Sequence, residues 1–194
     1  MATQIERSNQ TRTKLIEATV ALLVEHGYAA LGEQRICKRA GVSRGALRHH
    51  YPQGRYDLLP TVVETLLEAE SHRLAGLGMI SPKDRLYMML QGFLLHPRQG
   101  TSIAILEIWM AARGDTKLAQ CTGPAFSGAL TRLFGHSLHQ PADAEELAVR
   151  FLLHGAALHC FSSDYDELRL QEAVRWILQR LPVPTLQPPE LMLC

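Results

Sequence analysis

Apolar side chains recur every three to four residues along most of the chain, and this spacing limits the possible folds more than any other feature. Leu15, Ile16, Thr19, Leu22 and Leu23 are one example. These residues share one face only when the backbone is helical. Alternation of apolar and polar residues, which a half-buried strand needs, is scarce. We therefore expect an all-α protein.

Glycine, proline and capping residues divide the chain into expected helices. Gly27 and Gly41 suit the left-handed position that ends a helix, Ser43 suits an N-cap, and Pro52 ends the helix before it. Asp164 is the expected N-cap of the last helix, and we expect a break at Gly123 and Pro124. The expected helices cover 9–26, 33–40, 43–51, 56–74, 81–97, 101–113, 116–139, 142–162 and 164–181, before a proline-rich tail at 182–194.

Composition narrows the class of protein. The 194 residues are 46% hydrophobic and 20% charged, which is enough for a real core. No stretch approaches the ~18 apolar residues of a membrane helix, and the polar start lacks a secretory signal. The four cysteines are too far apart for a zinc knuckle or a disulfide framework. We expect a cytoplasmic protein that needs no cofactor and does not bind a membrane.

Positive charge is concentrated in the first third of the chain. Residues 1–60 hold nine Lys and Arg against five Asp and Glu, whereas residues 61–194 hold eleven against fourteen. A basic segment on an acidic remainder indicates that the first part meets a polyanion, although chance clustering explains so modest a surplus equally well.

The segment RICKRAGVSRGALRHHY, at 35–51, carries the clearest functional signal. Two short helices joined by a tight turn with glycine have the geometry of a helix-turn-helix. A helix in the major groove needs exposed donors for base edges and flanking cations for phosphate. The expected DNA contacts are Lys38, Arg39, Ser43, Arg44, Gly45, Ala46, Arg48, His49, His50, Tyr51 and Arg55. The plain alternative is a helical hairpin whose charges are simply solvated.

The order of residues around this segment resembles the TetR family of one-component transcriptional regulators. The matching residues run from Leu15 to Leu59 and include the strings AGVSRGAL and HYP, with nearly one-to-one spacing. Arg48 stands where the family commonly has Tyr, Arg55 where it has Lys, and Cys37 where it has Ala. These departures bear on the operator sequence more than on DNA binding itself.

The resemblance implies a DNA-binding domain at 1–55 and a helical effector-binding and dimerisation domain at 56–181. The protein would be a homodimeric repressor that leaves a double-stranded DNA operator, an inverted repeat, when a small molecule binds. The residues considered for the effector pocket are Met88, Met89, Phe93, Trp109, Met110 and Phe126. Those considered for the dimer interface are Phe151, His154, Gly155, Leu158 and Trp176.

Two other functions stay open at this point. An enzyme on a helical scaffold is disfavoured, because the chain has no phosphate-binding glycine loop and no nucleophile elbow. A helical protein-interaction module without DNA binding remains possible because Arg48 replaces the usual Tyr. His136 and His139 lie one turn apart, as metal ligands often do, but nothing near them completes a site, and we expect no metal.

Overall fold

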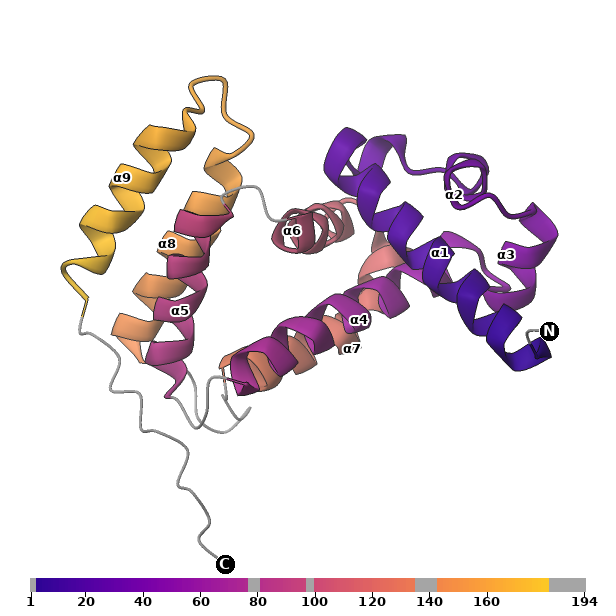
Figure 1. Ribbon diagram of the computed structural model, residues 1–194, viewed down its shortest axis with the longest axis horizontal. Coiled ribbons are helices and arrows are strands. Elements are labelled where there is room, and N and C mark those ends of the chain that lie inside the picture. Colours follow the sequence, from indigo (N-terminus) through magenta and orange to yellow (C-terminus); the bar gives the residue numbers. More distant parts are fainter. Residues whose placement is uncertain (1–2, 77–80, 97–99, 135–142, 182–194) are drawn as a thin grey trace, which may run out of the picture. The chain divides into compact units, whose positions relative to one another are not determined.

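The structure is a computed structural model that describes residues 3–76, 81–96, 100–134 and 143–181 (Figure 1). Within these residues it contains nine α-helices, one short 3-10 helix and no strand, which confirms the all-α expectation. The elements are α1 (Gln4–His26), η1 (Tyr28–Ala30), α2 (Glu33–Ala40), α3 (Arg44–His50), α4 (Arg55–Ala75), α5 (Pro82–Leu95), α6 (Gly100–Ala112), α7 (Thr116–Phe134), α8 (Ala144–His159) and α9 (Glu167–Leu178). None of these helices is both long and apolar enough to cross a membrane.

The chain forms two compact units. The first contains residues up to Leu66 together with Gly100–Phe126, and so combines α1, α2 and α3 with α6 and the first parts of α4 and α7. The second contains the remaining part of α4, α5, the end of α7, α8 and α9. The expected DNA-binding domain at 1–55 lies wholly in the first unit.

In the first unit, α1 is the central helix. It packs against α2 and α3, the two helices of the helix-turn-helix, and also against α6. Each helix contributes fully buried side chains to this core: Leu15, Leu23, Ile36, Leu47, Leu58, Ile108 and Leu118. The orientation of α3 is therefore determined by apolar contacts with α1 and α2.

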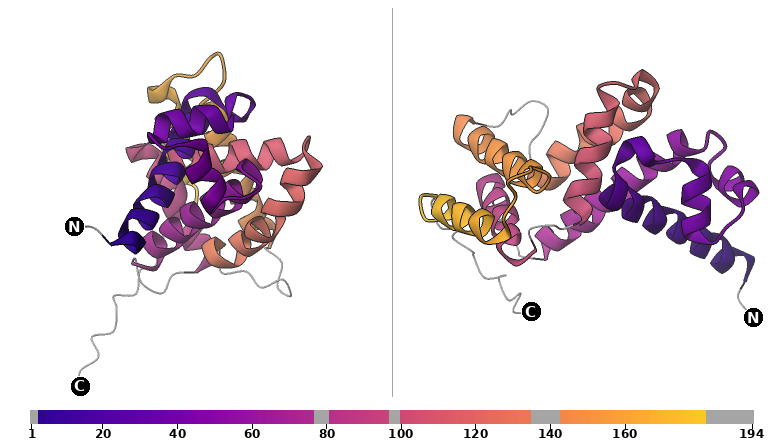
Figure 2. Two further views of the ribbon diagram at one scale, coloured as in Figure 1. Left: turned by 90° about the vertical axis from the view of Figure 1, so that its right-hand side faces the viewer. Right: turned by 90° about the horizontal axis from the view of Figure 1, so that it is seen from above.

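In the second unit, α5 packs against both α8 and α9 (Figures 1 and 2). The buried residues recur at helical spacing on each helix, as expected for a helix with one core-facing stripe: Leu86, Leu90 and Phe93, then Val149 and Leu153, then Leu170 and Val174. Ser81 and Asp84 form a capping box at the start of α5, which confirms the helix start expected there.

The start of α1 differs from the expectation. The helix begins at Gln4, because the Thr3 hydroxyl accepts a hydrogen bond from the Glu6 amide and the Glu6 carboxylate accepts one from the Thr3 amide. Thr3 and Glu6 have the T-x-x-E spacing of a capping box, which explains the earlier start. At the other end, Gly27 has φ 70° and ψ 175°, so it is a glycine-only conformation but not the left-handed helical one expected.

Two expectations about the later helices are wrong. Pro124 lies inside a continuous α7. Gln120 and Pro124 are both exposed, so the carbonyl that loses its amide partner lies on the solvent side. The N-cap of α9 is Asp166, which accepts from the Arg169 amide. Asp164 instead accepts a hydrogen bond from the Ser162 hydroxyl at 2.6 Å and belongs to the preceding turn.

We predict that Gly41→Ala lowers the free energy of unfolding by about 1 kcal/mol. Gly41 has φ 65° and ψ 35°, and a Cβ there would meet no atom within 4 Å, so the cost is purely conformational. Urea denaturation measures it. Gly41→Asn should cost less, because asparagine tolerates the left-handed region. Equal losses for the two variants would contradict this explanation.

Candidate nucleic-acid interface

The turn between α2 and α3 has the geometry of a helix-turn-helix. Gly41 adopts the left-handed conformation, and the Val42 amide donates to the Cys37 carbonyl at 3.1 Å. The Ser43 hydroxyl then accepts a hydrogen bond from the Ala46 amide at 3.0 Å, which confirms Ser43 as the N-cap of α3. α3 is thus a short helix held at both its buried face and its first turn.

The residues predicted to contact DNA differ in their access to solvent. Those on the surface of α2, the turn and α3 are Lys38, Arg39, Ser43, Arg44, Gly45, Arg48 and His49. Ala46 and His50 are half-buried. Tyr51 is only 3% exposed, so its ring belongs to the core of the first unit.

Two of the exposed arginines are already paired with carboxylates. Arg39 on α2 makes a two-point contact with Glu25 on α1, with Nη1 donating at 2.8 Å. This contact raises the pKa of Arg39 and lowers the pKa of Glu25. Arg48 on α3 makes a similar two-point contact with Glu33 on α2. Arg44 is different, since its side chain is 71% exposed and its nearest carboxylate oxygen, on Glu33, is 3.9 Å away.

Arg55 points into the first unit. Its guanidinium donates to the Leu31 carbonyl at 3.4 Å and to the Tyr56 hydroxyl at 3.2 Å, and it lies 3.7 Å from the Asp115 carboxylate. It also stacks over the rings of Tyr28 and Tyr56, 5.3 and 5.1 Å from their centroids. Arg55 therefore joins the helix-turn-helix segment to the start of α7.

Asp115 is the centre of a polar cluster that it forms with Tyr28, Arg55 and Tyr56. Its carboxylate accepts hydrogen bonds from the hydroxyls of Tyr28 and Tyr56, at 3.1 and 3.0 Å, and from the Leu118 amide at 3.0 Å. The Leu118 bond, followed by the two hydroxyls and Arg55, lowers the pKa of Asp115 below its ordinary value. Burial and the neighbouring carboxylate outweigh Arg55 and raise the pKa of Tyr28 to about 12.

A second carboxylate, that of Glu107, also binds the segment that follows α1. Glu107 on α6 accepts a hydrogen bond from the Tyr28 amide at 2.8 Å and lies close against Gly27. The loop that follows α1 is thus tied to α6 by Glu107 and to the start of α7 by Asp115. Sequence reasoning missed both carboxylates, because 79 and 87 residues separate them from Tyr28.

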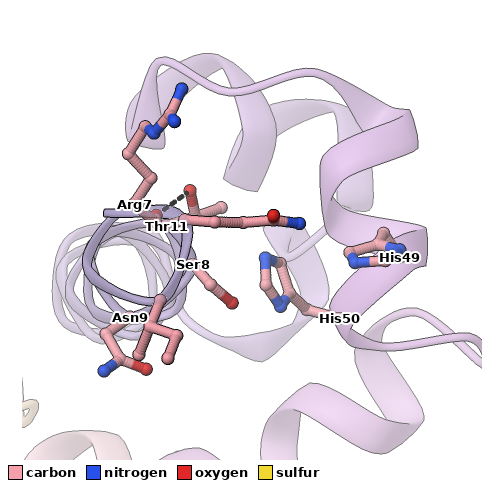
Figure 3. A pocket seen from close by; sticks show the side chains of 8 residues that line it. Arg7, Ser8, Asn9, Thr11, His49 and His50 are labelled. Atoms are coloured by element: carbon pink, nitrogen blue, oxygen red, sulfur yellow. Dashed lines mark hydrogen bonds between the residues drawn. The ribbon is translucent and has the colours of Figure 1, made fainter. Parts of the chain in front are cut away.

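An open groove of about 650 Å³ lies between the start of α1 and the end of α3 (Figure 3). Its lining is polar or basic apart from Ile5, and comprises Gln4, Ile5, Arg7, Ser8, Asn9, Thr11, His49 and His50. In Figure 3 the His50 ring lies between α1 and His49. Burial, then His49 and Arg12, lower the pKa of His50. The groove extends the basic surface of α3 onto α1.

Cys37 is buried against the turn, with its thiol 3.8 Å from the Ser43 carbonyl. Burial, followed by the nearby Glu33 carboxylate, raises the pKa of this thiol. A thiol with a raised pKa is a poor nucleophile, so this position suits packing better than redox sensing. The described residues contain no cluster of three or more potential metal ligands, and His136 and His139 lie outside them.

The residues considered for an effector pocket are divided between the two units. Met88, Met89 and Phe93 lie on α5, where Phe93 is buried and both methionines are half-buried. The other three lie in the first unit. Trp109 and Met110 are exposed on α6, and Phe126 is half-buried on α7. A role for these residues in effector binding stays a prediction.

The residues considered for a dimer interface lie on α8 and α9. Phe151 is 62% exposed and Leu158 is 43% exposed, and Gly155 is exposed between them on α8. Trp176 is exposed on α9 beneath the Arg180 guanidinium, which lies 3.6 Å from its ring centroid. His154 is half-buried, and burial is the main reason that its pKa is lowered.

Comparisons with known proteins agree with this geometry. Residues 15–60 match the family model described as bacterial regulatory proteins, tetR family. This range includes α2, the turn and α3. This segment of the chain matches the TetR family of bacterial regulatory proteins. The TetR match covers the helix-turn-helix and the polar cluster residues Tyr28, Arg55 and Tyr56.

One curated relative and two solved structures extend the comparison. The chain is 41% identical over 83 residues to the HTH-type transcriptional regulator CymR of Pseudomonas putida, an alignment that covers 42% of this chain and 40% of CymR. A TetR transcription regulator from Haloarcula marismortui has a TM-score of 0.61 and 26% identity over 89% of this chain and 96% of its own. A putative TetR-family regulator from Rhodococcus sp. has a TM-score of 0.65 at 16% identity, over 88% and 97%, and supports the fold alone.

We predict that Asp115→Asn lowers the melting temperature at neutral pH and that the difference from the wild type vanishes in acid. The folded-state pKa of Asp115 is below the ordinary 3.8, so its contribution is complete above that value and is lost as the pH falls through the folded-state pKa. Thermal denaturation between pH 7 and pH 2 measures this. Glu64→Gln removes an exposed carboxylate from the same unit and should change little. A difference of the same size at both extremes of pH would contradict the role of the Asp115 charge.

Proposed function

We propose that this protein is a DNA-binding transcriptional regulator, most simply a homodimeric repressor that a small molecule releases from its operator. The observation that carries the proposal is the exposed first turn of α3. There a rigidly capped helix presents Arg44 beside Gly45, which has no side chain to hold the DNA away. A bacterial regulator of this kind works in the cytoplasm, where its DNA is.

The basic side chains have different roles in this proposal. Arg44 is exposed, which suits a donor to base edges in the major groove. Lys38 is an exposed cation near the end of α2 and suits a phosphate contact. The groove of Figure 3, with Arg7 and His49, suits the phosphates that flank the recognised bases.

We predict that Arg44→Ala weakens the complex with a specific DNA by ~1–3 kcal/mol and affects random DNA much less. Lys38→Ala should weaken both complexes about equally and lower the salt slope by roughly one. Fluorescence anisotropy at several salt concentrations measures both effects, on a duplex selected from a random-sequence pool. Arg73→Ala, which removes an exposed arginine outside residues 1–55, is the control.

The selection itself separates the proposed function from its alternatives. A regulator should select a duplex related to an inverted repeat. If no sequence is enriched and random DNA does not bind at low salt, the protein is not a DNA-binding regulator, and the helical interaction module is the better reading.

The body from residue 56 to 181 is proposed to bind the effector and to dimerise. Dimerisation is supported by the outer face of α8. Exposed residues recur there at helical spacing and are almost all apolar: Ala148, Phe151, Leu152, Gly155 and Leu158. A soluble monomer rarely leaves such a patch uncovered. For the effector we propose apolar contacts within one unit, either from Met88, Met89 and Phe93 in the second unit or from Trp109, Met110 and Phe126 in the first.

We predict that the double variant Phe151→Glu, Leu158→Glu is a folded monomer with much weaker operator binding. Both side chains are exposed within the chain, so charge there should disrupt a dimer without disturbing the core. Analytical ultracentrifugation measures the mass, and circular dichroism checks the fold. Leu95→Glu alters another exposed leucine of the second unit and should remain dimeric. A double variant that still sediments as a dimer would place the interface elsewhere.

A further inference from the structure

We propose that Glu33 is a positioning residue of the DNA interface, and that its partner Arg48 holds α3 in place and does not contact DNA. The inference rests on the proposed function, because it concerns how α3 is presented to an operator. It reassigns Arg48, which sequence reasoning placed among the DNA contacts.

The contact between the two side chains is a fork. Arg48 Nε donates to Glu33 Oε2 at 3.1 Å, and Arg48 Nη2 donates to Glu33 Oε1 at 2.7 Å. This two-point geometry fixes the plane of the guanidinium as well as its position. Because Glu33 lies in the first turn of α2 and Arg48 in the last turn of α3, the fork joins the two helices of the motif.

The remaining terminal nitrogen of the Arg48 guanidinium contacts the chain beyond α3. Arg48 Nη1 donates to the Pro52 carbonyl at 2.7 Å. One side chain therefore links α2, α3 and the turn that leads into α4. Each of its three nitrogens donates one hydrogen bond to a protein acceptor, so the guanidinium is held against α2 and the turn, and only the second N–H groups of Nη1 and Nη2 remain without a bond to these acceptors.

Gly54 shows that the chain is built around the Glu33 carboxylate. This residue has φ 64°, and a Cβ on it would overlap the Glu33 carboxylate and lie 3.2 Å from the guanidinium carbon of Arg48. Position 54 thus favours glycine for its backbone conformation, and a side chain there would displace the Glu33 carboxylate from its present place. The Glu33 side chain is only 17% exposed.

The two roles considered for Arg48, DNA contact and positioning of α3, predict opposite effects of Glu33→Gln on DNA affinity. A carboxylate beside a DNA surface repels phosphate, so removing it should strengthen binding if Arg48 were a DNA contact that Glu33 holds back. If the fork positions α3, removing the carboxylate should weaken binding although it removes a negative charge.

The experiment is a double-mutant cycle of Glu33→Gln and Arg48→Gln on the selected duplex. We expect each single variant to lose about tenfold in operator affinity, the scale of one charge-assisted hydrogen bond. The double variant should lose far less than the two single losses combined, because both substitutions remove the same fork. Arg48→Gln also removes the bond to the Pro52 carbonyl, and Glu33→Gln also removes the 3.9 Å contact of Glu33 with Arg44. Arg48→Gln should leave the salt slope unchanged.

Glu25→Gln is the matched control. It removes a carboxylate from a comparable fork with Arg39 in the same unit, and it should leave operator affinity unchanged or higher. Arg48→Lys retains the charge but not the fork, so it should resemble Arg48→Gln. Tighter binding by Glu33→Gln, or a salt slope lowered by about one in Arg48→Gln, would overturn the proposal.

Amide hydrogen exchange keeps this test separate from the proposed function. In Glu33→Gln two amides should exchange faster than in the wild type: that of Tyr51, which donates to the Leu47 carbonyl at the end of α3, and that of Gly54, which donates to the Tyr51 carbonyl in the turn. Unchanged exchange would overturn the fork as a positioning device. If the wild type selects no duplex, the DNA-binding function and a role for Glu33 in it fail together. If the wild type binds and Arg44→Ala weakens it, the proposed function stands and the cycle alone decides on Glu33.

Discussion

The burial of Ile36 and Leu47 against α1 is the interaction on which the rest of the candidate interface depends. Both side chains are fully buried, one on each helix of the motif. Short helices of eight and seven residues have little stability of their own, so their positions come from this apolar contact. The turn at Gly41 and the cap at Ser43 then allow α3 to leave that core with its first turn exposed.

Carboxylates determine which basic residues remain available to a polyanion. Glu25 binds Arg39, Glu33 binds Arg48, and Asp115 lies beside Arg55. A net charge counted from the sequence treats all of these arginines alike. In the fold, most of the arginines predicted to contact DNA have carboxylate partners within the chain. The exposed positive charge that remains lies on the first turn of α3, at the end of α2 and in the groove beside α1.

Two carboxylates, Glu107 and Asp115, connect α6 and α7 to the segment that follows α1. α6 and the first part of α7 belong to the same compact unit as the helix-turn-helix. A shift of α6 or α7 would therefore change the hydrogen bonds that Glu107 and Asp115 accept from Tyr28. This offers a physical route for the coupling that ligand-controlled release requires.

The sequence by itself determined the helices and the motif, because these depend on local rules. Apolar spacing, the glycine at 41 and the hydroxyl at 43 act within a few residues, so α2, the turn and α3 could be predicted closely. The predicted helix break at Pro124 was wrong, because the cost of a proline depends on which face of the helix it occupies. The tertiary structure alone decided the pairing of Glu33 with Arg48 and of Asp115 with Tyr28 and Arg55. Those contacts join residues 15 to 87 positions apart, and no periodicity in the chain marks which carboxylate will meet which cation once the core has formed.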